Sequence, residues 1–231
     1  MRLRAEEPDL GPWQKLSAST VVAALLCFRP PDRPVVVAID GRGGSGKSTV
    51  AASLATAATD AGERAAVVAT DDVAWAAQAF FDWDELLVER VLTPARRGGA
   101  VCLRPSTRPA SGGFIPGTIE VPVDTTMLLI EGVGAARRTL APLLDHAVWV
   151  QSDLDIAFER GITRDCALWK RTREEAETQW HAFLTEEIPH LETDRPWERA
   201  DLVIAGNTAE PAPGRGDLRV AAQSRVLDGG I

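Results

Sequence analysis

The sequence predicts an α/β fold with a mainly parallel sheet. Short runs of Val, Ile, Leu and Ala recur along the chain, and helical patterns separate several of them. A glycine-rich turn follows the first of these runs and leads directly into a helical pattern. With 231 residues, of which 45% are hydrophobic, the chain can bury one sizeable core. We therefore predict a single domain over residues 1–207, with five core strands at 35–39, 65–69, 127–130, 147–150 and 202–204.

The first half of the domain has a recognisable order. Apolar residues at helical spacings over 13–28 predict a leading helix, which Arg29-Pro30-Pro31 ends. After the first strand, residues 47–61 predict a second helix with its stop signal at Gly62. Strand, helix and strand form a βαβ unit, whose right-handed crossover makes the sheet parallel.

The remaining segments predict additions to this core. Residues 84–97 have a helical pattern weakened at Pro94, and residues 98–122, rich in Gly, Pro and Thr, predict an inserted flap with short β pieces. A helical stretch over 154–188 contains a candidate lid at 153–175. The segment 208–231 has the composition of a flexible tail.

Composition limits the classes of partner. A net charge of −8 argues against a nucleic-acid or anionic-membrane binder, because such partners favour a broad basic surface. The three cysteines form no C-x-x-C pair, and no apolar run reaches membrane-spanning length. We expect a cytoplasmic protein with a small-molecule ligand; the sequence leaves monomer and homodimer both open.

Residues 41–48 are the most informative stretch, because they satisfy the G-x-x-x-x-G-K-[ST] pattern of a phosphate-binding loop (P-loop). Glycines let backbone N–H groups point at phosphate oxygens, Lys47 reaches the β/γ-phosphates, and Ser48 ligates Mg²⁺. A chance match is the alternative, and the scarcity of lysine argues against it. We expect the nucleotide to contact Gly41, Arg42, Gly43, Gly44, Ser45, Gly46, Lys47, Ser48 and Thr49.

Acidic residues follow three of the predicted strands. Asp40 ends the first, Asp71 and Asp72 follow the second, and Glu131 follows the third. Ligands of parallel sheets bind at the carboxyl ends of strands, and phosphoryl transfer needs carboxylates to accept a proton and to hold Mg²⁺. Helix capping by the aspartates and a turn role for Glu131 are the alternatives, and Asp40 could simply brace the loop.

Together these motifs resemble the uridine kinase and phosphoribulokinase-like group of P-loop small-molecule kinases. The resemblance spans about residues 35–204 and includes the P-loop, Thr-Asp-Asp at 70–72, Phe-Asp-Trp at 81–83, Leu-Ile-Glu-Gly at 129–132 and R-x-x-x-R-D at 160–165. It implies a three-layer P-loop NTPase fold with a mainly parallel five-stranded sheet, a flap insertion and a helical lid. It also implies Asp71 as catalytic base, Glu131 near metal and acceptor, and Arg160 and Arg164 as lid arginines on the ATP phosphates.

The lid arginines also have a physical rationale. Arg160 and Arg164 are four residues apart, so on a helix they share a face and can both reach a polyphosphate. The alternative is a solvated pair that bridges Asp153 or Asp165. We expect Asp71, Lys47, Arg160 and Arg164 to be catalytic, and Ser48, Glu131 and Asp71 to lie at the metal.

The acceptor side departs from the resemblance, because uridine kinases carry tyrosines near the nucleoside and this chain contains none. Trp75 and Phe81 could supply an aromatic surface instead, although core packing is an equal alternative for Trp75. Arg104 and Arg108 in the flap could bind an anionic acceptor or lie on the surface. Candidate substrate contacts are thus Asp72, Trp75, Phe81, Arg104 and Arg108.

The expected function is an ATP-dependent kinase that uses Mg²⁺ and transfers the γ-phosphoryl group to a hydroxyl of a small metabolite, with a uridine-like nucleoside as one candidate. Two alternatives remain open. A nucleoside monophosphate kinase would place basic residues around the acceptor. A nucleotide-dependent switch would hydrolyse slowly and signal through a partner, but the guanine-selecting N-K-x-D motif is absent from the sequence.

Overall fold

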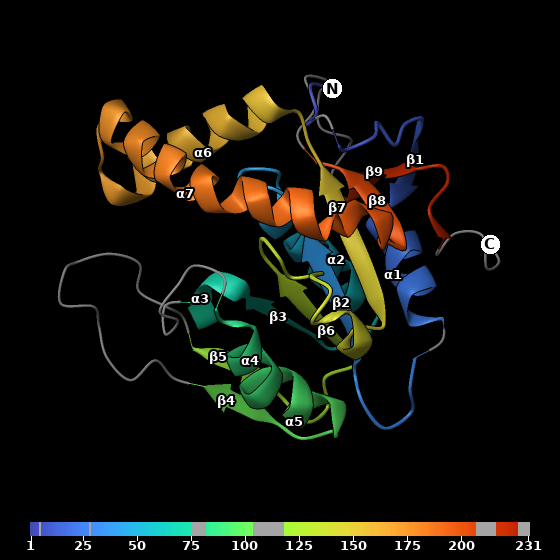
Figure 1. The fold of residues 1–231 in the computed structure, drawn as a ribbon. Helices are drawn as coiled ribbons and strands as arrows, with labels where there is room; N and C mark the ends of the chain where they lie inside the picture. The colour runs from blue at the N-terminus through green and yellow to red at the C-terminus, as the bar shows by residue number, and fades with distance from the viewer. Residues whose placement is uncertain (5, 28, 75–81, 104–117, 207–215, 226–231) are drawn as a thin grey trace.

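The computed structural model describes residues 1–4, 6–27, 29–74, 82–103, 118–206 and 216–225. In this part of the chain, strands and helices alternate around one large sheet (Figure 1). The sheet has seven strands in the order β1-β9-β8-β7-β2-β6-β3. Five of them run parallel and correspond to the five predicted core strands: β2 (Val35–Asp40), β3 (Ala65–Ala69), β6 (Met127–Glu131), β7 (His146–Gln151) and β8 (Leu202–Ala205).

Helices and apolar side chains cover both faces of the parallel strands, which gives the three layers that were predicted. Along β2, alternate residues belong to different core clusters: Val37 lies in one and Val36 in the other. The first cluster includes residues of α1 (Ala18–Leu26) and α2 (Lys47–Asp60). The second includes residues of α3 (Thr70–Ala74), α4 (Asp84–Leu87), the π-helical turn η1 (Val88–Leu92) and α5 (Thr93–Arg96).

The two remaining strands correct the expectation for the chain ends. Residues predicted as the start of the leading helix form β1 (Trp13–Ser17), and α1 begins only after Ser17, whose Oγ accepts from the Thr20 N–H at 3.0 Å. β1 pairs antiparallel with β9 (Asp217–Ala221). β9 lies inside the segment expected to be a flexible tail, and its Val220 and Ala221 are fully buried. Burial of these side chains holds this part of the tail in the sheet, beyond residue 207.

The insertion after α5 is seen at its base. β4 (Val101–Leu103) and β5 (Ile119–Val121) pair antiparallel, as a flap hairpin requires. Residues 104–117 lie outside the described part of the chain. The helix predicted over 84–97 continues past Pro94, with the π-helical turn η1 preceding it.

The helical stretch predicted over 154–188 consists of two helices, α6 (Leu154–Trp169) and α7 (Arg173–Asp194). Lys170 adopts the left-handed conformation (φ 53°) at the end of α6, and Thr172 forms a capping box with Glu175 at the start of α7. The two helices lie side by side and extend beyond the sheet (Figure 1). Two 3₁₀ turns, η2 (Ala141–Leu143) and η3 (Pro196–Glu198), lie between other elements of the chain. The expected lid, 153–175, is therefore one part of a longer hairpin.

Candidate active site

The P-loop joins β2 to α2, as its motif requires. Gly46 precedes α2 in the left-handed region (φ 102°), and Lys47 is the first residue of the helix. Gly44 is also left-handed (φ 70°), and a Cβ there would lie 2.0 Å from the carbonyl oxygen of Ala157 in α6. The loop therefore passes directly against α6, where only glycine fits.

Two cavities meet at this loop. The larger, of about 700 Å³, lies between the loop and α6, and the smaller, of about 410 Å³, lies between the loop, the ends of β3 and β6, and α7. Lys47, Ser48 and Arg164 line both. The P-loop thus forms a shared wall between a space on its α6 side and a space on its α7 side.

Ser48 and Glu131 are brought together at this wall. Because β2 and β6 are parallel neighbours with Ile39 opposite Glu131, the end of β6 lies beside the P-loop. Ser48 Oγ donates to Glu131 Oε1 at 3.0 Å. Burial raises the pKa of Glu131, an effect that the charge of Lys47 opposes.

Asp71 and Asp72 occupy the first turn of α3, immediately after β3. Asp71 is exposed and lines the smaller cavity with Glu131, as expected for two strand-end carboxylates. Asp72 is partly buried, and the nearby negative charges of both aspartates help to raise the pKa of Glu131. The structure thus brings Asp71, Glu131 and Ser48 to one side of the P-loop.

Lys47 is almost fully buried, with its side chain turned toward its own loop. Its Nζ donates to the carbonyl oxygen of Arg42 at 2.8 Å. Burial lowers the pKa of Lys47, while the carboxylates of Glu131, Glu187, Asp40 and Asp71 oppose this shift. The ammonium group of Lys47 therefore lies among carboxylates of the protein itself.

Arg160 and Arg164 both face the larger cavity from α6, as their spacing predicted. Arg164 also lines the smaller one. Its Nε donates to Asp165 Oδ1 at 2.9 Å, so the predicted alternative of a bridge to Asp165 is present as well. The side chain of Arg164 remains 56% exposed and can leave this partner at little cost.

Arg42 differs from its neighbours in the motif, because its side chain points into the protein interior. Its guanidinium pairs with Glu7 from the N-terminal segment, and Glu7 also accepts from Trp149 Nε1 at 2.9 Å and Gln151 Nε2 at 3.1 Å. Burial lowers the pKa of Arg42 to about 10. Its side chain braces the loop from behind, a role that the motif alone could not indicate.

Asp40 is a second internal brace. Its carboxylate is fully buried and accepts from the N–H groups of Gly41, Gly134 and Ala136 at 2.7 to 2.9 Å. These bonds tie the start of the P-loop to the segment that follows β6. The bracing role considered for Asp40 from the sequence agrees with this geometry.

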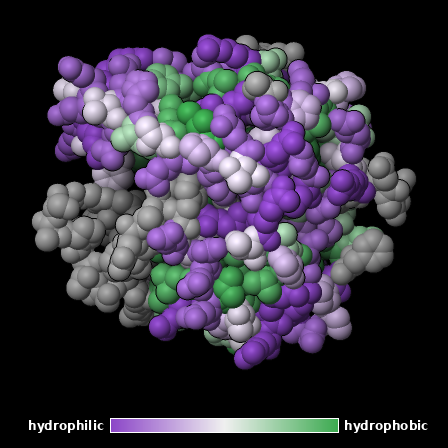
Figure 2. Space-filling model, viewed as in Figure 1, coloured by the Kyte–Doolittle hydropathy of each residue, from purple (hydrophilic) through white to green (hydrophobic). Residues whose placement is uncertain are grey.

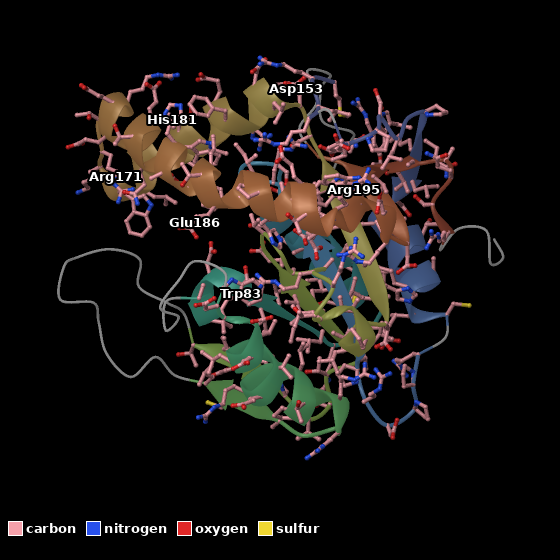
Figure 3. All side chains as sticks on the ribbon, in the orientation of Figure 1. Trp83, Asp153, Arg171, His181, Glu186 and Arg195 are labelled. Atoms are coloured by element: carbon pink, nitrogen blue, oxygen red, sulfur yellow. The ribbon has the colours of Figure 1, made fainter. Side chains whose placement is uncertain are left out.

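Residues of α7 were missed by the sequence analysis, which ended the lid at residue 175. Gln179, Trp180, Phe183 and Glu186 line the smaller cavity. In Figure 3, Glu186 lies on the side of α7 that faces α3. The sequence indicates only weakly which face of α7 lines the cavity, because polar residues dominate this helix and a single apolar stripe is not evident in it.

Four candidate substrate residues, Trp75, Phe81, Arg104 and Arg108, lie outside the described part of the chain. Among the described residues, no group of three or more His, Cys, Asp or Glu side chains is arranged to hold a metal ion by itself.

None of the described helices is long and apolar enough to cross a membrane. The visible face is hydrophilic along α7, and hydrophobic side chains gather near α6 and around α4 (Figure 2).

Comparison with solved structures supports the predicted fold. A protein from Silicibacter sp. TM1040, provisionally named a fructose transport system kinase, has 20% identity and a TM-score of 0.59, covering 80% of this chain and 95% of its own. The YGR205w protein has 12% identity and a TM-score of 0.55, covering 82% and 93%. No protein-family model matches the chain, and no curated protein matches it in sequence. The α/β architecture that the sequence predicted is thus confirmed as a fold that this chain shares with these solved structures.

Proposed function

We propose that this protein is an ATP-dependent kinase that transfers the γ-phosphoryl group to a hydroxyl of a small metabolite. The observation that carries the proposal is the P-loop as the shared wall of two cavities, with Arg160 in one and Asp71 in the other. A phosphotransferase needs this separation, because donor and acceptor must approach the transferred group from opposite sides. Lys47 and Ser48, which face both cavities, lie where the γ-phosphate would pass.

The larger cavity would hold the nucleotide. The backbone N–H groups of the P-loop and the N-terminus of α2 favour phosphate there, because they present partial positive charge. Arg160 and Arg164 add two cations from α6, and the flexible exposed side chain of Arg164 can reach the transferred group. Their role would be to hold the polyphosphate and to neutralise charge in the transition state.

Ser48 and Glu131 fit a Mg²⁺ ion. A hydroxyl and a carboxylate lie 3.0 Å apart at the wall, and Mg²⁺ takes one or two such oxygen ligands and completes its shell with phosphate oxygens and water. That arrangement requires no three-carboxylate cluster. When bound, the ion would supply neutralisation of phosphate charge.

On the acceptor side, Asp71 would accept the proton of the attacking hydroxyl. It is exposed in the smaller cavity, so it can meet a substrate directly, and its neighbour Glu131 would keep the local field negative and favour proton transfer. Side chains of α7 cover this cavity. This cover would exclude water, which would otherwise compete as a phosphoryl acceptor.

Charge in the smaller cavity supports a neutral acceptor over an anionic one. Its described lining contains four carboxylates, from Asp71, Glu131, Asp165 and Glu186, and two cations, Lys47 and Arg164. A nucleoside or another hydroxylated metabolite suits this balance. A nucleoside monophosphate kinase is the alternative, and it depends on Arg104 and Arg108, which lie outside the described residues.

The test is a screen for acceptor-dependent release of ADP or GDP, with ATP and GTP as donors and nucleosides, nucleoside monophosphates, sugars and hydroxy acids as acceptors. We expect turnover with a neutral hydroxylated acceptor, and Lys47→Ala should abolish most of it because the lysine reaches the β/γ-phosphates. Lys15→Ala, at an exposed surface pair far from the site in sequence, is the control. Nucleotide binding without turnover on any acceptor would instead favour a switch protein.

A further inference from the structure

We propose that Glu187 of α7 competes with the triphosphate for the P-loop and thereby sets the nucleotide affinity of the site. The inference rests on the proposed function. Glu187 Oε1 accepts a hydrogen bond from the Gly43 backbone N–H at 2.5 Å. A carboxylate oxygen thus occupies one of the loop N–H groups whose type binds phosphate oxygens in P-loops.

The position of the contact points to the terminal phosphates. Gly43 lines the smaller cavity, and Lys47, which the motif assigns to the β/γ-phosphates, interacts electrostatically with Glu187. The Nζ of Lys47 is itself bonded to the Arg42 carbonyl oxygen. Two phosphate-binding groups of the loop, one N–H and the lysine, are therefore both engaged within the protein.

The packing of α7 against the P-loop determines the position of Glu187. It is only 2% exposed, and the rings of Trp180 and Phe183, on the same side of α7, pack against the same loop residue. A Cβ at Gly43 would lie 2.9 Å from the Phe183 ring and 3.1 Å from the Trp180 ring. Residues 180, 183 and 187 follow helical spacing, so one face of α7 docks on Gly43.

The electrostatics of the contact make the competition effective. Burial is the largest effect and raises the pKa of Glu187, and the Gly43 N–H and the cations Lys47, Arg42 and Arg4 oppose this rise. In its ionised form, Glu187 offsets the charge of these cations. An incoming polyphosphate would meet both a bonded N–H and a like charge in a poorly solvated place.

The experiment compares Glu187→Gln with the unmodified chain and with Glu192→Gln, an exposed glutamate of α7. Glutamine keeps an oxygen that can accept from Gly43 but removes the charge. We expect Glu187→Gln to bind ATP on the order of tenfold more tightly by calorimetry, as removal of one nearby like charge implies. AMP, which lacks the β- and γ-phosphates, should bind all three proteins equally.

Glu187→Ala removes both the charge and the acceptor, and should tighten ATP binding at least as much. Equal ATP affinity of wild type, Glu187→Gln and Glu187→Ala would overturn the inference. Loss of folded protein in both variants, checked by thermal unfolding, would overturn it too, because Glu187 would then serve the stability of the fold. If the wild type binds no triphosphate, or binds it equally after Lys47→Ala, the proposed function itself fails.

Discussion

At the scale of single residues, the candidate site depends on where each strand ends. Asp71 and Glu131 are far apart in the sequence, and the parallel pairing of β3 with β6 places both at one edge of the sheet. This explains why residues chosen by their position after a strand line one cavity. Arg42 shows the opposite case. Its motif position suggested a nucleotide contact, and a buried carboxylate from the N-terminal segment directs its side chain inward.

The role of Asp71 can be tested with Asp71→Asn. The amide cannot accept a proton from the acceptor hydroxyl, so phosphoryl transfer should fall by about two to four orders of magnitude. ATP affinity should change little, because Asp71 is exposed and the solvent screens its charge. Steady-state and pre-steady-state kinetics measure the first effect, and calorimetry the second.

Asp60→Asn, at the exposed end of α2, controls for the loss of one negative charge. A transfer rate of Asp71→Asn within a few-fold of this control would remove Asp71 as the base.

At the scale of elements, α6 and α7 share a small apolar core. Trp180 packs with Ile162 and Ala176 in a small core between the helices, and its ring is edge-on to Phe158 at 6.1 Å. The same ring touches Gly43 of the P-loop. Packing between α6 and α7 and docking of α7 on the P-loop are therefore served by one side chain.

Trp180→Ala should lower the free energy of unfolding by about 3–5 kcal/mol, because it leaves a large cavity in this core. The same change at Trp169, which is 37% exposed at the end of α6, should cost much less. Chemical denaturation of both variants measures the difference. Equal losses would mean that Trp180 does not hold the hairpin.

At the scale of the whole molecule, the first and last strands of the chain, β1 and β9, lie together at one edge of the sheet. β1 and β9 pair along five residues, from Trp13 opposite Ala221 to Ser17 opposite Asp217. β9 also borders β8, so the segment after residue 207 completes the sheet beside the parallel strands. Segments nearly the full length of the chain apart thus share one edge.

Val220→Ala tests whether this part of the C-terminal segment belongs to the folded domain. Val220 is fully buried in the core of α1 and α2, so removal of two carbons should cost about 2 kcal/mol. Lys15→Ala, which breaks the surface pair with Asp217 on the same two strands, should cost less than about 1 kcal/mol. An unchanged thermal midpoint for Val220→Ala would contradict the assignment of β9 to the core.

The sequence by itself determined the parts whose physics is local. Runs such as Val35–Asp40 are apolar because both faces of a central parallel strand are covered, and the P-loop motif is a continuous segment, so both were predicted from short windows. The helix period correctly placed Arg160 and Arg164 on one cavity. Tertiary structure alone decided the rest. β1 and β9 stabilise each other across the length of the chain, the Arg42 side chain follows Glu7, and α7 reaches Gly43 through Glu187, because each depends on a partner that lies far away in the sequence.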